Sequence, residues 1–455
     1  MEYNEFLATK LQSGRLNGFG PIDMPEFLFD FQQAIVDWAL HKGRAAIFAD
    51  CGLGKTPMQL VWADNVIRKT NKPVLIITPL AVASQTIREG EKFGLEAKRL
   101  PDGMVWGGIN VTNYERLHYF NPADFGGVVC DESSILKNFD GVRKAAITEF
   151  MRQLPYRLLC TATAAPNDYI ELGTSSEALG ELGYMDMLTR FFTNKQHSIA
   201  TNRFHGEAAQ WRFKGHAGHS FWRWVTSWAR ACRKPSDLGY DDDGFILTPL
   251  EERETIIQAR LTRPGMLFDI DAVGMKEERE VRRRTLNERC EAAASKVINT
   301  GQPAVMWCHL NDEGNLLARL IPDAVQVSGS DSDEAKESKF DSFQTGQTRV
   351  LVIKPKIGAF GLNWQHCAHV VYFPSYSYEQ YYQAVRRCWR FGQTRPVIID
   401  LICTEAQNLM FANLKRKADA ADRMFTDLVS YMNESVSIER QREYRNEVKL
   451  PSWLS

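Results

Sequence analysis

Residues 44–60 read RAAIFADCGLGKTPMQL, and this stretch decides how the first part of the chain folds. The apolar run RAAIFAD (44–50) predicts a buried strand, and the residues that begin with Lys55 predict a helix. A glycine-rich turn lies between them. Backbone N–H groups of such a turn and of a helix N-terminus can surround phosphate oxygens. ADCGLGKT (49–56) is therefore predicted to be a phosphate-binding loop.

The residues of this loop have separate expected tasks. Lys55 is expected to place a positive charge beside the β- and γ-phosphates, and Thr56 to bind a magnesium ion. A glycine-rich turn with an exposed lysine is the alternative interpretation. The predicted nucleotide contacts within the loop are Gly52, Leu53, Gly54, Lys55 and Thr56.

Two adjacent carboxylates end a later apolar run, VVCDESS (128–134). An acid at the end of a second strand beside a phosphate loop completes the magnesium site of many nucleotide hydrolases. Asp131 is expected to bind the ion, directly or through water, and Glu132 to orient or deprotonate the attacking water. An acidic helix cap is the alternative. The two sites together predict an ATPase or GTPase, and the sequence lacks the base-reading Asn-Lys-x-Asp of GTPases.

Short apolar runs alternate with helical patterns in the first and last thirds of the chain. In the first third the further expected strands are PVLIITP (73–79), GGINVTNY (107–114), GGVVCDE (126–132) and YRLLCTAT (156–163). In the last third they are PAVMWCH (303–309), AVQVSG (324–329), TRVLVIK (348–354), AHVVYF (368–373) and PVIIDLIC (396–403). This pattern predicts two α/β domains, each with a parallel sheet covered by helices on both faces.

The composition limits the other possibilities. The 455 residues carry a formal net charge of -1, so nucleic-acid binding would depend on local patches of positive charge. Nine scattered cysteines without a CxxC pair suggest a reducing cytosol rather than a disulfide framework or a zinc ribbon. No apolar run approaches ~18 residues, so we expect no membrane helix and a cytoplasmic location.

In motif content and order, the chain resembles the superfamily-two helicases and translocases, and within them the Swi/Snf-type DNA translocases. The resemblance covers about residues 25–175 and 285–405. Phosphate loops in that superfamily commonly begin with alanine, as here at Ala49. The other segments that carry it are Phe31-Gln32, TPLAV (78–82), TNYE (112–115), DESSILKN (131–138), CTATAAPN (160–167), KPKIGAFGLN (354–363) and QAVRRCWRFGQ (383–393).

The resemblance implies two RecA-like domains in tandem, with ATP and Mg²⁺ between them and nucleic acid, preferably double-stranded DNA, across both. It implies that Gln32 reads the adenine and that Gly358 is a further nucleotide contact. The implied nucleic-acid contacts are Thr78, Thr112, Asn113, Lys354 and Lys356, although each of these is equally readily a solvated strand cap. The residues implied to couple hydrolysis to movement are Thr161 and Thr163. The lack of long tails resembles bacterial or phage proteins, which suggests a bacterial or phage-infected host cytoplasm.

The stretch YYQAVRRCWRFGQ (381–393) concentrates positive charge. Gln383, Arg387 and Arg390 share one face of a helix, so an anion is expected opposite them. The ATP phosphates held at Lys55 meet this expectation. Arg387 and Arg390 are therefore the predicted arginine fingers, and Gln383 is expected to position the attacking water or to contact the phosphates. Arg386, off the centre of this face, is expected to pair with an acid or with DNA.

The middle of the chain, residues 176–284, interrupts the pattern. Residues 191–235 contain eight Lys or Arg and one Glu, with nine Phe or Trp among them. The region is predicted to be a mainly helical aromatic-basic insert, whose aromatic residues either form a core or stack on bases. A zinc site at His216 and His219, with His205 or Cys232, is a weaker alternative. The complete predicted division is 1–24, 25–175, 176–284, 285–404 and a C-terminal helical segment at 405–455, which is expected to brace the second α/β domain.

Three functions follow from these motifs. The first is an ATP-dependent translocase on double-stranded DNA. The second is a helicase that separates strands, or moves DNA branches, on DNA or RNA. The third is a nucleic-acid-binding switch that ATP gates without translocation. The biological pathway and the protein partners are open.

Overall fold

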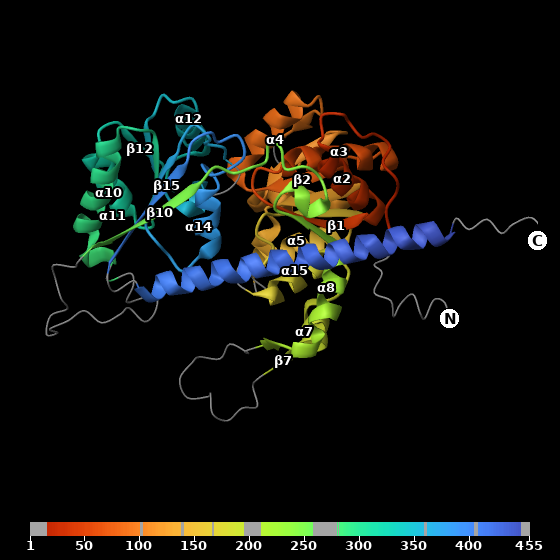
Figure 1. Ribbon diagram of the computed structural model, residues 1–455. Helices are drawn as coiled ribbons and strands as arrows, with labels where there is room; N and C mark the ends of the chain where they lie inside the picture. The colour runs from red at the N-terminus through yellow and green to blue at the C-terminus, as the bar shows by residue number, and fades with distance from the viewer. Residues whose placement is uncertain are drawn as a thin grey trace, which may run out of the picture.

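The computed structural model describes residues 16–100, 103–137, 141–165, 168–194, 211–257, 280, 282–358, 362–404 and 408–446. These residues form two α/β domains side by side, with one long helix running across them (Figure 1). Each domain is built on its own parallel sheet.

The first sheet contains seven strands, and all its neighbouring pairs are parallel. In spatial order they are β3 (Ala97–Lys98), β4 (Ile109–Asn113), β2 (Val74–Thr78), β5 (Gly127–Asp131), β6 (Tyr156–Cys160), β1 (Arg44–Ala49) and β9 (Ala229–Cys232). One face is covered by α2 (Asp30–Lys42), α3 (Lys55–Thr70) and α4 (Leu80–Lys92). The other is covered by α5 (Val142–Arg152), α6 (Leu172–Leu179), α7 (Tyr184–Phe191) and α8 (Gly218–Thr226). Both faces are apolar because successive side chains of a strand point to opposite sides.

The second sheet has six parallel strands. Their order is β10 (Leu250–Ile257), β15 (Val397–Thr404), β14 (His369–Tyr372), β11 (Ala304–Trp307), β13 (Val350–Ile353) and β12 (Ala324–Gln326). On one face lie α10 (Leu286–Thr300) and α11 (Asn311–Leu320), and on the other α12 (Asp333–Gln344) and α14 (Tyr378–Val385). The short α13 (Pro355–Gly358) follows β13. All ten predicted strands are present, and the predicted pair of parallel-sheet domains is confirmed.

The described part of the middle region belongs to these two domains rather than to a third one. β9 pairs with β1 at the edge of the first sheet, and β10 pairs with β15 at the edge of the second. The hairpin of β7 (Phe192–Asn194) and β8 (Trp211–Phe213) extends from the first domain (Figure 1). The predicted boundary at residue 176 therefore does not coincide with the edge of the first domain. Strand β9 reads only ARAC, which is too short and too weakly apolar to predict a strand.

The aromatic residues of this region form a core. Phe221, Trp224, Val225 and Trp228 are buried in the same apolar cluster as the first sheet. This confirms the first of the two interpretations of the insert, in which its aromatic residues form a core.

The C-terminal helix α15 (Asn408–Asn446) corrects a second prediction. It was expected to brace the second domain, from which it emerges after β15. Instead, Met424, Phe425 and Leu428 are buried in the apolar core of the first domain, and α15 contacts α8 and β9 (Figure 1). The helix therefore joins the two domains. The helix was expected from the sequence, but the surface on which it packs was not.

The described candidate zinc ligands differ in their exposure to solvent. His216 and His219 are exposed, whereas Cys232 is buried at the sheet edge, and His205 lies outside the described residues. Within the described ranges, no three His, Cys, Asp or Glu side chains are grouped to hold a metal ion. All nine cysteines are free thiols. None of the described helices combines the length and the apolar character needed to span a bilayer.

Candidate nucleotide site between the domains

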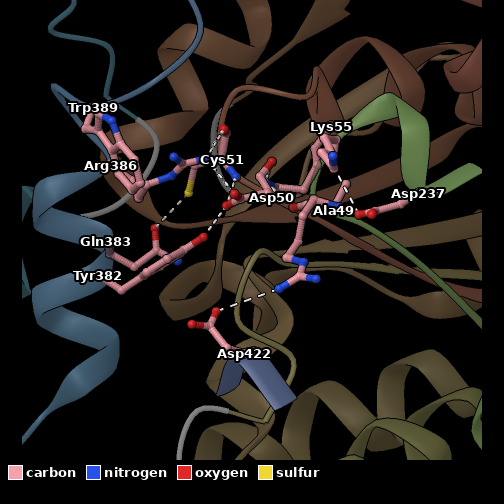
Figure 2. Close-up of polar contacts among 12 residues, drawn as sticks. Ala49, Asp50, Cys51, Lys55, Asp237, Tyr382, Gln383, Arg386, Trp389 and Asp422 are labelled. Carbon is pink, nitrogen blue, oxygen red and sulfur yellow. Dashed lines mark hydrogen bonds and ion pairs between the residues drawn. The ribbon is translucent and has the colours of Figure 1, made fainter. Parts of the chain in front are cut away.

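The predicted phosphate loop connects β1 to α3 and lies against the second domain (Figure 2). Gly52 and Gly54 have φ angles of 91° and 73°, which side chains other than glycine rarely adopt. A Cβ atom on Gly54 would lie 2.3 Å from Gln32 Nε2, and one on Gly52 would lie 2.8 Å from Phe391 Cδ2. The loop is therefore held from both sides, by α2 and by the second domain.

Lys55 folds back along its own loop. Its Nζ donates hydrogen bonds to the carbonyl oxygens of Ala49, at 2.9 Å, and Asp50, at 3.2 Å (Figure 2). These backbone acceptors hold the ammonium group beside the loop. The group borders a cavity that the carboxylates at the end of β5 also line.

Asp131 and Glu132 are buried at the carboxyl end of β5. Asp131 accepts hydrogen bonds from Gln59 Nε2 at 2.6 Å and from the Thr78 hydroxyl at 3.2 Å. Burial raises the pKa of both carboxyl groups, although the charge of Lys55 opposes this shift. Glu132 also has a φ of 49°, which is uncommon outside glycine and typical of functional positions.

The opposite wall of the cavity comes from the second domain. Arg387 donates to Gln383 Oε1 at 2.8 Å and to the carbonyl oxygen of Leu362 at 3.1 Å. Arg390 donates to the same carbonyl at 3.3 Å. Burial, together with the charge of Arg387, lowers the pKa of Arg390 to about 10. The second wall therefore carries two guanidinium groups that repel each other, and the acids Glu89 and Glu132 line the same cavity.

The two walls enclose a cavity of about 110 Å³. The first domain contributes Lys55, Thr56, Asp131 and Glu132, and the second contributes Arg387 and Arg390. Within the described part of the chain, two atoms of these lining residues, Glu132 Oε2 and Arg390 Nε, are buried without a hydrogen-bond partner. Buried polar atoms are normally paired, so this combination favours a charged ligand with hydrogen-bonding groups. A polyphosphate with a bound cation has that chemistry.

The arginine wall belongs to a segment that is similar to a known family. Residues 292–392 match the helicase conserved C-terminal domain. This helicase-like domain includes strands β11 to β14 and helix α14. This match supports, for this part of the chain, the resemblance to helicases that the motifs predicted.

A solved structure is also similar to the chain. The SWI2/SNF2 ATPase core of Sulfolobus solfataricus, in complex with dsDNA, matches 90% of this chain and 95% of that chain, at 17% sequence identity and a TM-score of 0.39. No curated protein matches the sequence.

Two residues that were predicted to contact the nucleotide, Gln32 and Gly358, are in contact with other residues of the protein. Gln32 is buried; it accepts a hydrogen bond from Phe29 N at 3.0 Å and donates one to Leu53 O at 2.9 Å. Its observed role is to hold the phosphate loop, rather than to present a free amide to a base. Gly358 of the helicase-like domain is not among the residues that line the cavity, and a Cβ atom there would lie 2.3 Å from Ile353 Cδ1. Packing therefore accounts for this glycine, and the prediction of a nucleotide contact at Gly358 is not supported by its position.

The predicted nucleic-acid contacts of the first domain differ in position from what was expected. Thr78 is fully buried, and its hydroxyl donates to Asp131. Thr112 is buried within β4. Asn113 accepts a hydrogen bond from Arg116 N at 3.1 Å but borders the large cleft between the domains. Thr78 and Thr112 thus face the interior, because strand ends in a parallel sheet are covered by neighbouring loops.

The helicase-like domain contributes the two predicted lysines. Lys354 donates to Asn311 Oδ1. Lys356 is exposed and lines the large cleft. Of the two, Lys356 has the position that contact with a nucleic-acid backbone requires.

The predicted coupling residues lie between the acidic pair and the helicase-like domain. A hydrogen bond from Thr161 opposes the rise in the pKa of Glu132 that burial causes. The Thr163 hydroxyl donates to Glu379 Oε1 of α14 at 3.5 Å. This short segment therefore touches the Glu132 carboxylate on one side and the second domain on the other.

Sequence reasoning missed several contacts between the domains. Asp50 accepts hydrogen bonds from Tyr382 and Arg386 of the helicase-like domain (Figure 2). Lys137 forms an ion pair with Glu379. An acid partner for Arg386 was one of the two expectations, but only the fold identifies it as Asp50. A pair separated by 336 positions leaves no local pattern in a single sequence.

Proposed function

We propose that this protein is an ATP-dependent nucleic-acid motor, and specifically a translocase on double-stranded DNA. The observation that carries the proposal is the cavity between Lys55 and Glu132 on one domain and Arg387 and Arg390 on the other. A site divided between two domains can link the chemical state of its ligand to the distance between those domains.

In this proposal, the chain's own groups perform hydrolysis as follows. Lys55 and the loop backbone bind the phosphates of ATP. Glu132 accepts a proton from the water that attacks the γ-phosphorus, and the bond from that phosphorus to the oxygen of ADP breaks. Arg387 and Arg390 neutralise charge on the transferred phosphoryl group, an effect worth ~10³–10⁵ in rate for such arginines.

Magnesium fits the donor set of the site. Thr56 and Asp131 would hold the ion, because both border the cavity and Asp131 is a buried carboxylate whose pKa burial raises. When bound, the ion supplies positive charge at the β- and γ-phosphate oxygens.

A second cleft, of about 710 Å³, supports the nucleic-acid part of the proposal. Both domains line it, and its basic residues are Arg99, Arg116, Lys137, Arg143, Lys336 and Lys356. Several of these cations are paired with acids, for example Arg143 with Glu115 at 2.9 Å. Phosphates would compete with these acids for the cations. Contacts of this kind read the backbone and not the bases, as movement along a strand requires.

The cleft and the nucleotide cavity share Glu132, and the coupling segment lies beside them. A change in the distance between the domains would therefore affect both sites. The preference for double-stranded DNA rests on the sequence resemblance to the Swi/Snf-type branch, carried by Leu136-Lys137-Asn138 and Arg387-x-x-Arg390-x-Gly392-Gln393.

The test is a panel of ATPase measurements with duplex DNA, single strands, branched DNA and RNA. We expect duplex DNA to increase the rate many-fold. A rate that duplex DNA leaves unchanged would contradict the translocase proposal. Displacement of a DNA triplex strand reports movement and would exclude a stationary switch, whereas unwinding of forks or RNA hybrids would favour a helicase.

A further inference from the structure

One face of α14 and the residue that follows it contacts the first domain along its whole length. Glu379, Tyr382, Gln383 and Arg386 are spaced so that they share this face. Glu379 pairs with Lys137, and Gln383 Oε1 accepts from Cys51 Sγ at 3.7 Å. Arg387 and Arg390, which line the nucleotide cavity, lie outside this face.

The most buried contact on this face is the ion pair of Arg386 with Asp50. Arg386 Nη2 lies 2.6 Å from Asp50 Oδ2 and also donates to the carbonyl oxygen of Cys51 at 2.9 Å (Figure 2). Exposed side-chain fractions are 1% for Arg386 and 10% for Asp50. Burial lowers the pKa of Arg386, but the charge of Asp50 outweighs it and the pKa is raised overall. Removing one partner would leave the other as a buried, unpaired charge.

Asp50 also shapes the phosphate loop. Its Oδ1 accepts a hydrogen bond from Cys51 N at 2.6 Å and one from the Tyr382 hydroxyl (Figure 2). Neither Asp50 nor Arg386 lines the nucleotide cavity. The pair therefore lies behind the site and joins the backbone of the phosphate loop to the segment that carries the arginines.

We propose that the Asp50–Arg386 pair positions Arg387 and Arg390 over the phosphate loop. Arg386 directly precedes Arg387 in the chain, so anchoring Arg386 to the loop limits where both cavity-lining arginines can stand. A displacement of ~1 Å in such a site can cost about 100-fold in rate. Arg386 is thus a positioning residue, and the inference rests on the proposed ATPase function.

The first experiment separates turnover from binding. Arg386→Met keeps a long side chain beside Trp389, whose ring centre lies 4.9 Å from the guanidinium, but it removes the charge. We expect kcat to fall by at least about tenfold, while the Kd of a fluorescent ATP analogue changes by less than about threefold. Arg386→Lys should restore part of kcat. Arg253→Met, at an exposed arginine on β10 paired with Glu251, is the matched control and should leave kcat unchanged.

The second experiment tests whether the two residues act as a pair. Asp50→Asn keeps an oxygen that accepts from Cys51 N and removes the charge that Arg386 needs. The double variant should lose no more kcat than the more severe single variant, because both changes break one contact. Losses that multiply would overturn the proposal.

The third measurement does not depend on hydrolysis. Fluorescent labels at the exposed residues Met104 and Ile298, each changed to cysteine, would report the distance between the domains without nucleotide. The native cysteines are buried, which favours selective labelling. We expect Arg386→Met to broaden the distance distribution, and an unchanged distribution overturns the positioning proposal. A wild type without ATPase activity would instead overturn the proposed function, while a broadened distribution would still support the contact between the domains.

Discussion

Buried groups on the two walls of the nucleotide cavity have pKa values shifted in opposite directions. Burial raises the pKa of Asp131 and Glu132, and it lowers the pKa of Arg390 to about 10. Each shift disfavours the charged form. A bound cation would stabilise the carboxylates, and phosphates would stabilise the arginine. A magnesium–nucleotide complex, the ligand that we propose, would therefore stabilise the charged groups of both walls.

Replacing Lys55 or Glu132 separates binding from chemistry. Lys55→Ala should abolish ATP hydrolysis, since it removes the charge beside the phosphates. Glu132→Gln should preserve ATP binding and reduce turnover by ~10²–10⁴, the usual contribution of a positioned base. Nucleotide binding and phosphate release measured on both variants check this. An active Glu132→Gln enzyme would refute the assignment of the base.

His309 should make stability depend on pH. Burial lowers the pKa of His309 to about 4 from its usual 6.5, so the unfolded chain binds its proton first as the pH falls. Stability from this residue is complete above about pH 6.5 and is lost towards about pH 4, up to ~3 kcal/mol. Urea unfolding at several pH values should show a smaller loss for His309→Gln than for the wild type. Equal losses in the two proteins would exclude His309 as the cause.

At the scale of elements, helix α15 packs on a different domain from the one that precedes it in the chain. It follows the last strand of the second sheet, yet Leu428 is fully buried in the core of the first domain. The ion pair of Arg233 with Asp422 adds only a weak and partly exposed contact, at 3.8 Å. Apolar packing therefore holds this helix in place.

Leu428→Ala should reveal that packing. It should lower the free energy of unfolding by about 2–4 kcal/mol, because it removes buried methyl groups and leaves a cavity. Ser430→Ala, at an exposed position of the same helix, is the control and should change stability by less than about 0.5 kcal/mol. Denaturant titrations of both variants provide the measurement. Similar stabilities for the two variants would show that α15 is not packed as described.

At the scale of the whole molecule, the function depends on surfaces to which both domains contribute. The nucleotide cavity and the large cleft are each lined by residues of both α/β domains. Contacts between α4 and α12, such as the hydrogen bond from the Ser84 hydroxyl to Glu337 at 2.9 Å, also join the two domains. Opening of the domains would change both sites together.

A substitution of Lys356 tests whether nucleic acid binds in the large cleft. Because it is exposed at the cleft wall, Lys356→Ala should weaken nucleic-acid binding about equally for all sequences. It should also reduce the slope of log K against log salt by about one. Binding titrations at several salt concentrations measure both effects, with Arg253→Met as a control outside the cleft. A loss confined to certain sequences would show base recognition instead.

Local patterns predicted the parts of the fold that depend on short segments. The ten strands, the turn at Gly52 to Gly54 and the acidic end of β5 all lie where the sequence placed them. β9 was missed because an edge strand of four residues carries too little pattern. Thr78 was expected to be a surface contact, since a sequence does not show which loop covers a strand end.

The sequence by itself determined the strand–turn–helix of the phosphate loop, the alternating α/β order and the residue types of the site. Each of these depends on neighbours within a few residues, through periodicity, glycine conformation and charge. Only the tertiary structure decided that Asp50 meets Arg386, that α15 packs on the first domain and that Gln32 holds the loop. Those outcomes depend on packing between distant segments, and packing is settled only when the two sheets and their helices are in contact.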